Sequence, residues 1–163
     1  MESGRGLRFL HFVKLFLLAF IGSIAPAVAI NIEKRLLLWA GLGGALGYCV
    51  ALAFNPYSLS FNIAQIFMGT VFVGLYSELM ATYLKAPATV FCIPGIFPFV
   101  PGVSAYQTVL SLANNEFNQA AVYGLNTVFK SFTIAFGIMI VTAFFRFVRK
   151  QNKRGENLPS NSK

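Results

Sequence analysis

The sequence contains no aspartate and a single histidine, and only 11% of its 163 residues are charged. A soluble domain of this size has too much surface for so few charges, so the composition indicates an integral membrane protein. Without aspartate, a Ser-His-Asp relay is impossible, and His-rich or paired-carboxylate metal sites lack ligands. We therefore expect no enzymatic activity, no metal and no other cofactor.

Cysteine is equally scarce. Cys49 and Cys92 lie in apolar segments and match neither a disulfide framework nor a metal-binding pattern, so we interpret both as small packing residues. The net charge is +8, but the basic residues lie between apolar runs and in the C-terminal tail. This distribution follows the positive-inside rule of membrane proteins and argues against a nucleic-acid partner.

What the chain does have is apolar sequence: 56% of its residues are hydrophobic. They form five runs, at 15–30, 36–54, 61–84, 88–113 and 120–148. Each run approaches or exceeds the roughly 20 residues that cross a bilayer. The short connections predict an all-α, five-helix transmembrane bundle. We expect one membrane domain over residues 1–148 and a polar, basic, disordered cytoplasmic tail over 149–163.

The first run has an alternative interpretation as a signal peptide. Basic residues precede it, and Ala27-Val28-Ala29 resembles a signal-peptidase site, so cleavage after Ala29 would leave four spans. We expect the helix to be retained. With five spans and a cytoplasmic C-terminus, nine lysines and arginines lie inside and three outside, which predicts an N-out, C-in orientation in the lipid bilayer.

The fourth run contains an unusual segment, FCIPGIFPFVPGVSAY, at residues 91–106. Its prolines and glycines are Pro94, Gly95, Pro98, Pro101 and Gly102. Each proline removes a backbone donor, and in a membrane the freed groups are tolerated only against protein or a water-filled cavity. We predict a proline-broken fourth helix that restarts near Val103 and presents unpaired N–H groups, beside Ser104 and Tyr106, to an anion. The alternative is a kinked span whose prolines only shape the bundle.

The last run carries a polar stripe, because Tyr123, Asn126, Lys130, Thr133 and Gly137 follow spacings of three and four. Lys130 lies about 15 Å past the start of the run, where a charge is costly unless it faces protein or water. The stripe therefore favours a lined path. The alternative is a span that begins near Lys130, with the lysine snorkelling to the surface.

Two further groups of residues stand out. In the third run, Gln65 belongs to a polar face, and Glu78 is a secondary candidate for ion coupling, with an ion pair as the simpler interpretation. In the second run, Gly43, Gly44 and Gly47 form a small-residue face. Such a face lets a neighbouring helix, from this chain or from a partner, approach closely.

The proline segment also carries a resemblance. Ile93-Pro94-Gly95, Phe97-Pro98, Val100-Pro101-Gly102 and Ser104-Ala105-Tyr106 resemble the signature of the threonine/serine exporter family. Support comes from Arg35-Leu36-Leu37-Leu38, Gly44-Ala45-Leu46-Gly47 and the residues 85–91. The chain is more closely similar to the family's short, stand-alone C-terminal half, from about Leu17 to Val148. Lys130 matches no family motif.

This resemblance implies a subunit of a secondary exporter in the bacterial inner membrane. It also implies a complementary subunit of the N-terminal-half type and a small carboxylate substrate such as threonine, serine or succinate. We predict a substrate path formed by Gln65, Pro94, Gly95, Pro98, Pro101, Gly102, Ser104, Tyr106, Asn126 and Lys130. A non-transporting membrane scaffold and a small homo-oligomeric channel remain the alternatives.

Overall fold

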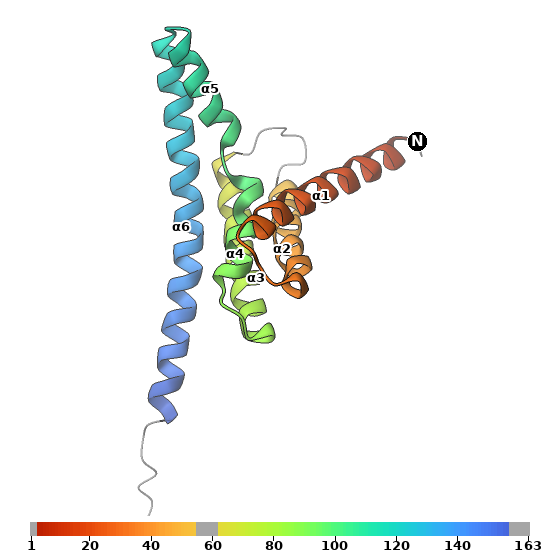
Figure 1. Cartoon of the computed structure of the whole chain (residues 1–163), viewed down its shortest axis with the longest axis vertical. Coiled ribbons are helices and arrows are strands. Elements are labelled where there is room, and N and C mark those ends of the chain that lie inside the picture. The colour runs from red at the N-terminus through yellow and green to blue at the C-terminus, as the bar shows by residue number, and fades with distance from the viewer. Residues whose placement is uncertain (1–2, 55–61, 157–163) are drawn as a thin grey trace, which may run out of the picture.

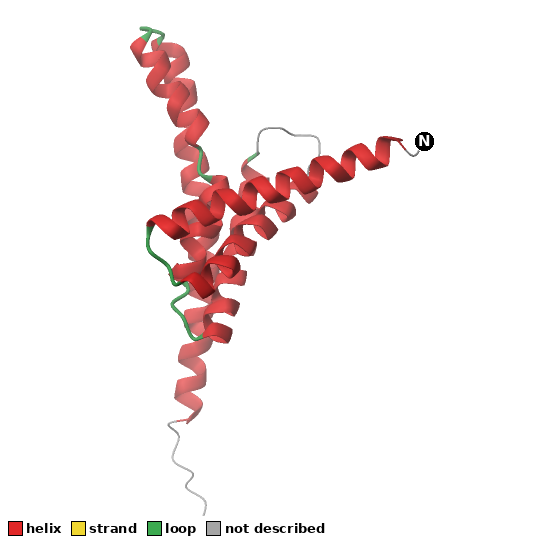
Figure 2. Ribbon diagram, turned by 45° about the vertical axis from the view of Figure 1, so that its right-hand side comes forward, coloured by secondary structure: helices red, strands yellow, loops and turns green. Residues whose placement is uncertain are grey.

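The computed structural model describes residues 3–54 and 62–156, and every regular element in these ranges is helical (Figure 2). The elements are α1 (Ser3–Ala29), α2 (Lys34–Phe54), α3 (Ile63–Leu84), α4 (Thr89–Ile96), the 3₁₀ helix η1 (Phe97–Phe99), α5 (Gly102–Ala113) and α6 (Phe117–Glu156). By length and hydropathy, α1, α2, α3 and α6 each suffice to cross a membrane. The helix pair from α4 to α5, bent by 54°, makes a fifth candidate span when it is counted as one broken span. The all-α architecture with a broken fourth helix is thus confirmed.

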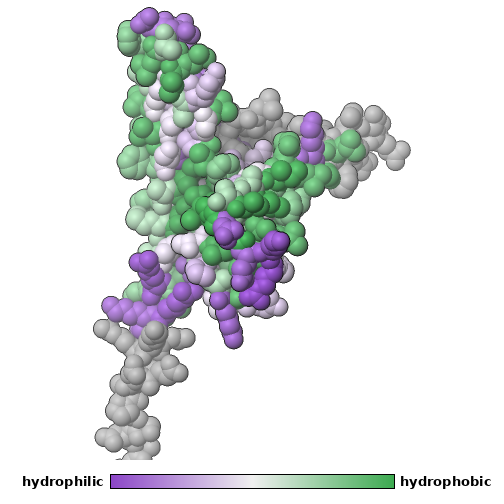
Figure 3. All heavy atoms as spheres, in the orientation of Figure 1, coloured by the Kyte–Doolittle hydropathy of each residue, from purple (hydrophilic) through white to green (hydrophobic). Residues whose placement is uncertain are grey.

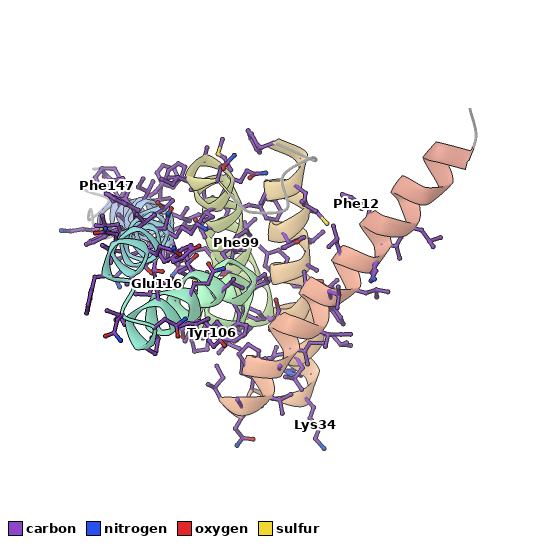
Figure 4. The ribbon with its side chains drawn as sticks, turned by 90° about the horizontal axis from the view of Figure 1, so that it is seen from above. Phe12, Lys34, Phe99, Tyr106, Glu116 and Phe147 are labelled. Atoms are coloured by element: carbon purple, nitrogen blue, oxygen red, sulfur yellow. The ribbon has the colours of Figure 1, made fainter. Side chains whose placement is uncertain are left out.

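Helices α2, α3 and α4 pack closely together with the C-terminal half of α1, and we call this unit the body. One cluster of buried apolar residues lies around Val73 and Phe99 and includes Ala51, Ile66 and Ile134. A second cluster joins Ala27, Leu36, Ala40 and Phe91. Figure 4 shows Phe99 among the helices of the body, whereas Phe12 lies on the part of α1 that leaves it.

Helices α5 and α6 form a second unit, which we call the arm. They lie side by side as a hairpin, and the C-terminal half of α6 returns along α3 (Figure 1). The upper part of this hairpin and the N-terminal part of α1 diverge from the body on opposite sides, as both ribbon views show. The molecule is therefore an open shape rather than a closed bundle.

The tight connections between helices turn at residues with a left-handed backbone. Asn31, Lys85 and Asn115 have φ angles of 58°, 52° and 60°. Asparagine tolerates this conformation because its short side chain can hydrogen-bond locally. Each turn reverses the chain within a few residues, which gives the antiparallel neighbours that the short connections predict.

The C-terminal boundary differs from the expectation of a disordered tail. Helix α6 continues to Glu156, so the first residues of the tail predicted from 149 are helical, while residues 157–163 lie outside the described ranges. Lysine, arginine and glutamine have high helix propensity, and extending an existing helix costs far less than nucleating a new one. The division at residue 148 stays a prediction.

The surface is apolar over most of its height, and hydrophilic side chains gather at the lower end in Figure 3. The α1–α2 and α3–α4 connections and the C-terminal part of α6 lie there, with Lys34, Arg35, Lys85, Arg146 and Arg149 exposed. Helices α2 and α3 have 21 and 22 residues. They are therefore about 31 and 33 Å long, close to the roughly 30 Å of a hydrocarbon core.

Candidate functional site at the break in the fourth span

The predicted packing glycines lie against neighbouring helices of this chain. A Cβ atom built on Gly43 would lie 2.8 Å from the Tyr76 ring of α3. One built on Gly44 would collide with the Ser23 hydroxyl of α1, and one on Gly47 with Val73 of α3. The lack of side chains at these positions is what allows α1 and α3 to approach α2 so closely.

The first half of the broken span is tightly packed. Helix α4 runs through Pro94 without interruption, and Pro94 and Gly95 are both buried. A Cβ built on Gly95 would lie 2.6 Å from Cγ1 of Val73, and one built on Gly69 would lie 2.5 Å from the Phe99 ring. These contacts form part of the body's core, so this half of the span presents no room for a solute.

The break itself falls after η1, at Val100 and Pro101. The Gly102 N–H donates back to the Val100 carbonyl at 2.8 Å, and the Ala105 N–H donates to the Pro101 carbonyl at 3.0 Å. Between them, the N–H groups of Val103 and Ser104 have no acceptor among the described residues. Pro101 stands at the N-cap position and has no side-chain oxygen to cap them. The start of α5 is therefore an open set of donors.

Contacts between helices fix the height of this break relative to α6. Thr108 of α5 lies against Gly124 of α6, with 3.4 Å from its Cγ2 to a Cβ built on the glycine. Gly102 precedes Thr108 by six residues, and Lys130 follows Gly124 by six. Because the two helices are antiparallel, Gly102 and Lys130 lie at about the same level.

The register between α3 and α6 shows that the start of α3 also lies at the level of Lys130 and Gly102. Thr70 contacts Gly137, and Gly74 contacts Val141, so equivalent positions differ by 67 residues. Lys130 is therefore level with Ile63, the first residue of α3. The N-termini of α3 and α5, each with a positive dipole end, flank α6 at the height of Lys130. Because α3 is as long as a hydrocarbon core is thick, a bilayer that α3 spans from end to end has its edge, not its middle, at this level.

The family follows from a comparison with known proteins. The model of the threonine/serine exporter family, ThrE, matches residues 15–144. The chain belongs to the threonine/serine exporter family. It is thus a multi-pass membrane protein of a transporter family rather than an enzyme. No solved structure matches the chain.

In this exporter-family chain, part of the predicted stripe on α6 faces the neighbouring helices. Tyr123, Lys130 and Thr133 are half-buried and Gly137 is buried, whereas Asn126 is exposed and its amide donates to the Val122 carbonyl of its own helix at 3.3 Å. Among the described residues, Lys130 has no ion pair or hydrogen bond. Whether Lys130 lines a path or snorkels to the surface stays a prediction.

The remaining predicted path residues are spread over different surroundings. Pro98, Pro101 and Ser104 are half-buried around the break, Gly102 is exposed, and Tyr106 is 67% exposed on the outside of the exporter chain's hairpin. Gln65 is 2% exposed; its side-chain oxygen accepts from the Asn62 N–H at 2.9 Å, and its amide donates to the Ala51 carbonyl at 3.2 Å. The structure therefore brings the break and Lys130 to one level, and it does not bring Gln65 into an open space.

At the opposite end of the same exporter-family chain, Glu78 meets a residue that sequence reasoning missed. Arg149 donates to the Glu78 carboxylate at 2.9 Å, and the carboxylate side chain is only 9% exposed. The two residues are 71 positions apart, so local spacing gives no sign of the pair. The only signal was a lone carboxylate at the basic end of the third span, together with the arginines that end the last span.

Proposed function

We propose that the chain is the small membrane subunit of a secondary exporter for small carboxylates, namely threonine, serine or dicarboxylates such as succinate. It acts in the bacterial inner membrane, N-out and C-in, with a complementary subunit of the N-terminal-half type. The observation that carries the proposal is the common level of Lys130 and the N-termini of α3 and α5.

The chemistry of this level suits a carboxylate. A helix N-terminus behaves as roughly half a positive charge and offers N–H donors to an anion. The unpaired N–H groups of Val103 and Ser104, the Ser104 hydroxyl and the Lys130 ammonium add directional donors to this positive field. In the proposed orientation this is the outer mouth of the path, where a solute anion is held before release.

The orientation rests on the charges at the other end. The exposed basic residues of the α1–α2 and α3–α4 connections and of the end of α6 share one end of the molecule (Figure 3). Basic residues in short loops face the cytoplasm, which supports a cytoplasmic C-terminus.

The hairpin supports a protein partner. Between Lys130 and Phe117 the arm rises about 20 Å beyond the level at which α3 begins. Its surface there is mostly hydrophobic below a hydrophilic tip (Figure 3), and Val103, Tyr106, Val109, Phe117, Val122 and Leu125 are each at least 58% exposed. Apolar surface outside the bilayer needs protein to cover it, and the complementary subunit is the proposed cover.

The test is transport by both subunits reconstituted in vesicles, with labelled threonine, serine and succinate. Lys130→Gln should raise the KM for the exported acid about tenfold or more, because a hydrogen bond to a charged group is worth about 1.5–3 kcal/mol and 1.4 kcal/mol is tenfold. Lys130→Arg keeps the charge and should retain most of the activity.

Lys85→Gln is the matched control, since it removes an exposed lysine at the opposite end and should leave KM unchanged. An equal KM for Lys130→Gln and the parent protein would remove Lys130 from the site. Absence of flux for all three acids, with both subunits present, would reject the substrate class.

A further inference from the structure

The helices of the body are joined to one another by polar bonds as well as by packing. The Gln65 amide of α3 donates to the Ala51 carbonyl of α2 at 3.2 Å. Near the other end of the same pair, the Tyr76 hydroxyl of α3 donates to the Trp39 carbonyl of α2 at 2.8 Å. Both bonds would have to break for α2 and α3 to slide, so these two helices behave as one rigid unit.

The arm is attached to the body by a seam of a different kind. Along α3 and α6 the contacts are Thr70 on Gly137 and Gly74 on Val141. The Thr70 hydroxyl donates to carbonyls of its own helix, at 2.8 and 3.0 Å, and the Thr133 hydroxyl of α6 donates to a carbonyl of its own helix at 2.8 Å. In the middle of the seam, α3 and α6 are therefore held together by dispersion contacts. When two helices slide past each other in a membrane, such contacts are replaced at little cost by contacts with neighbouring apolar groups.

The connection between the body and the arm is also permissive. Helix α5 makes extensive contact only with α6. The chain enters α5 through Val100, Pro101 and Gly102, and a Cβ built on Gly102 would meet nothing within 4 Å. Hinges are a few residues at element ends that absorb changes in φ and ψ, and this connection has that position and that free space.

One polar link joins the arm to the body within the described residues, and it lies at the far end from this hinge. Arg149 of α6 donates to Glu78 of α3 at 2.9 Å and to the Thr82 hydroxyl at 3.5 Å. Glu78 is fifteen residues along α3 from Ile63, so the link is about 22 Å from the level of Lys130. Separating the pair leaves a buried carboxylate without a counter-charge, which is strongly unfavourable.

We propose that the arm moves as one unit against the body about the Val100–Gly102 hinge, and that the Glu78–Arg149 ion pair is the latch that holds its inner end closed. The proposal rests on the proposed function, because the motion opens the inner end of the solute path while the level of Lys130 forms the outer end. It gives Glu78 and Arg149 a mechanical role in place of direct ion coupling.

Disulfide trapping tests whether the arm must move. In a chain with Cys49 and Cys92 replaced by alanine, Gly74→Cys and Val141→Cys place two thiols across the seam, where the Cβ–Cβ separation is 3.1 Å, near the range of a disulfide. Oxidation of the double variant, reconstituted with its partner subunit, should reduce transport at least tenfold, and a reductant should restore it. Each single-cysteine variant is the control and should keep its activity after oxidation.

The latch itself is tested by the rate at which the same disulfide forms, without any substrate. Glu78→Gln and Arg149→Gln should each slow its formation at least threefold, and the exchanged pair Glu78→Arg with Arg149→Glu should return it to within twofold of the parent. Glu33→Gln is the matched control, because it breaks an exposed ion pair with Arg35 (3.3 Å) far from the seam and should leave the rate unchanged.

The outcomes separate the two proposals. Full transport by the oxidised double variant overturns the moving arm, and disulfide rates in all three pair variants equal to that of the parent overturn the latch. If the reduced protein exports none of the tested acids but the rates still depend on the pair, the latch stands and the proposed substrate falls. Should Gly74→Cys prevent folding, Thr70→Cys with Gly137→Cys probes the same seam one turn away, at a Cβ–Cβ separation of 3.3 Å.

Discussion

At the scale of single residues, Gly44 and Gly22 are the same residue type in opposite surroundings. Gly44 lies where α1, α2 and α4 meet, with Cβ of Ser23 at 2.8 Å and the Gly95 carbonyl at 3.3 Å from any Cβ added to it. Gly22 lies inside α1, and a Cβ added there meets nothing within 4 Å. The first glycine is required by packing, while the second only weakens its helix.

This contrast predicts opposite effects of one substitution. Gly44→Ala should destabilise the protein by about 1–3 kcal/mol, the usual cost of overpacking a tight contact. Gly22→Ala should be neutral or stabilise by up to about 1 kcal/mol, because alanine is the better helix former. Thermal unfolding of the purified variants in one detergent measures both. A loss of stability for Gly22→Ala equal to that for Gly44→Ala would contradict the packing argument.

The small-residue face of α2 was predictable from spacing alone, but the identity of its neighbours was not. The sequence places Gly43, Gly44 and Gly47 on one side of a helix. Whether α1, α3 or a partner fills that side depends on contacts between segments that local patterns do not encode. Gln65 is different, because its role was open to prediction from local spacing. It follows Asn62 by three residues, which is the spacing of a capping box, so the sequence also indicates a structural role at the start of α3.

At the scale of helices, Gln65 holds the start of α3 to the end of α2. Its side chain accepts from the Asn62 N–H and donates to the Ala51 carbonyl, and it is nearly inaccessible to solvent. Removing this side chain takes a partner from the part-buried Asn62 N–H and from the buried Ala51 carbonyl, and the lost bond to the buried carbonyl carries most of the cost.

Gln65→Leu should therefore lower the free energy of unfolding by about 1–3 kcal/mol. The KM for the exported acid should change little in whatever fraction of the protein stays folded. Thermal unfolding and vesicle transport of the same preparation measure the two effects. Asn126→Leu is the control for stability, since the Asn126 amide is exposed and bonds only to its own helix. A raised KM with unchanged stability would return Gln65 to the substrate path.

The break in the fourth span shows how far helix-level prediction reaches. Prolines and glycines predicted a broken helix, and α5 begins at Gly102, one residue before the predicted restart at Val103. The height of the break within the membrane was not predictable. It depends on the pairing of Thr70 with Gly137 and of Thr108 with Gly124, which are contacts between segments far apart in sequence. Those contacts place Lys130 level with the start of α3, which is the edge of a bilayer that α3 spans from end to end, although counting from the start of its apolar run places it well inside.

At the scale of the whole molecule, the length of α6 is the feature that a single bilayer does not accommodate. From Phe117 to Phe145 the helix carries only one charged residue, Lys130, and is about 43 Å long. Fitting that length into a 30 Å core would take a tilt of about 45°, beyond the 0–40° found for transmembrane helices. The body, whose helices already match the bilayer, would have to tilt with it.

The upper hairpin is therefore expected to lie against protein, and a charge placed on it tests this. Leu125→Lys should leave the amount of protein in the membrane unchanged, because the position lies outside the hydrocarbon, but it should reduce co-purification of the complementary subunit at least fivefold. Tyr83→Lys is the matched control, since Tyr83 is 76% exposed near the inner end of α3, where lysine snorkels to the headgroups. Full recovery of the complementary subunit with Leu125→Lys would show that this subunit does not bind the upper hairpin at Leu125. Loss of the variant from the membrane would instead place the hairpin in lipid, and the level of Lys130 would then lie inside the bilayer rather than at its edge.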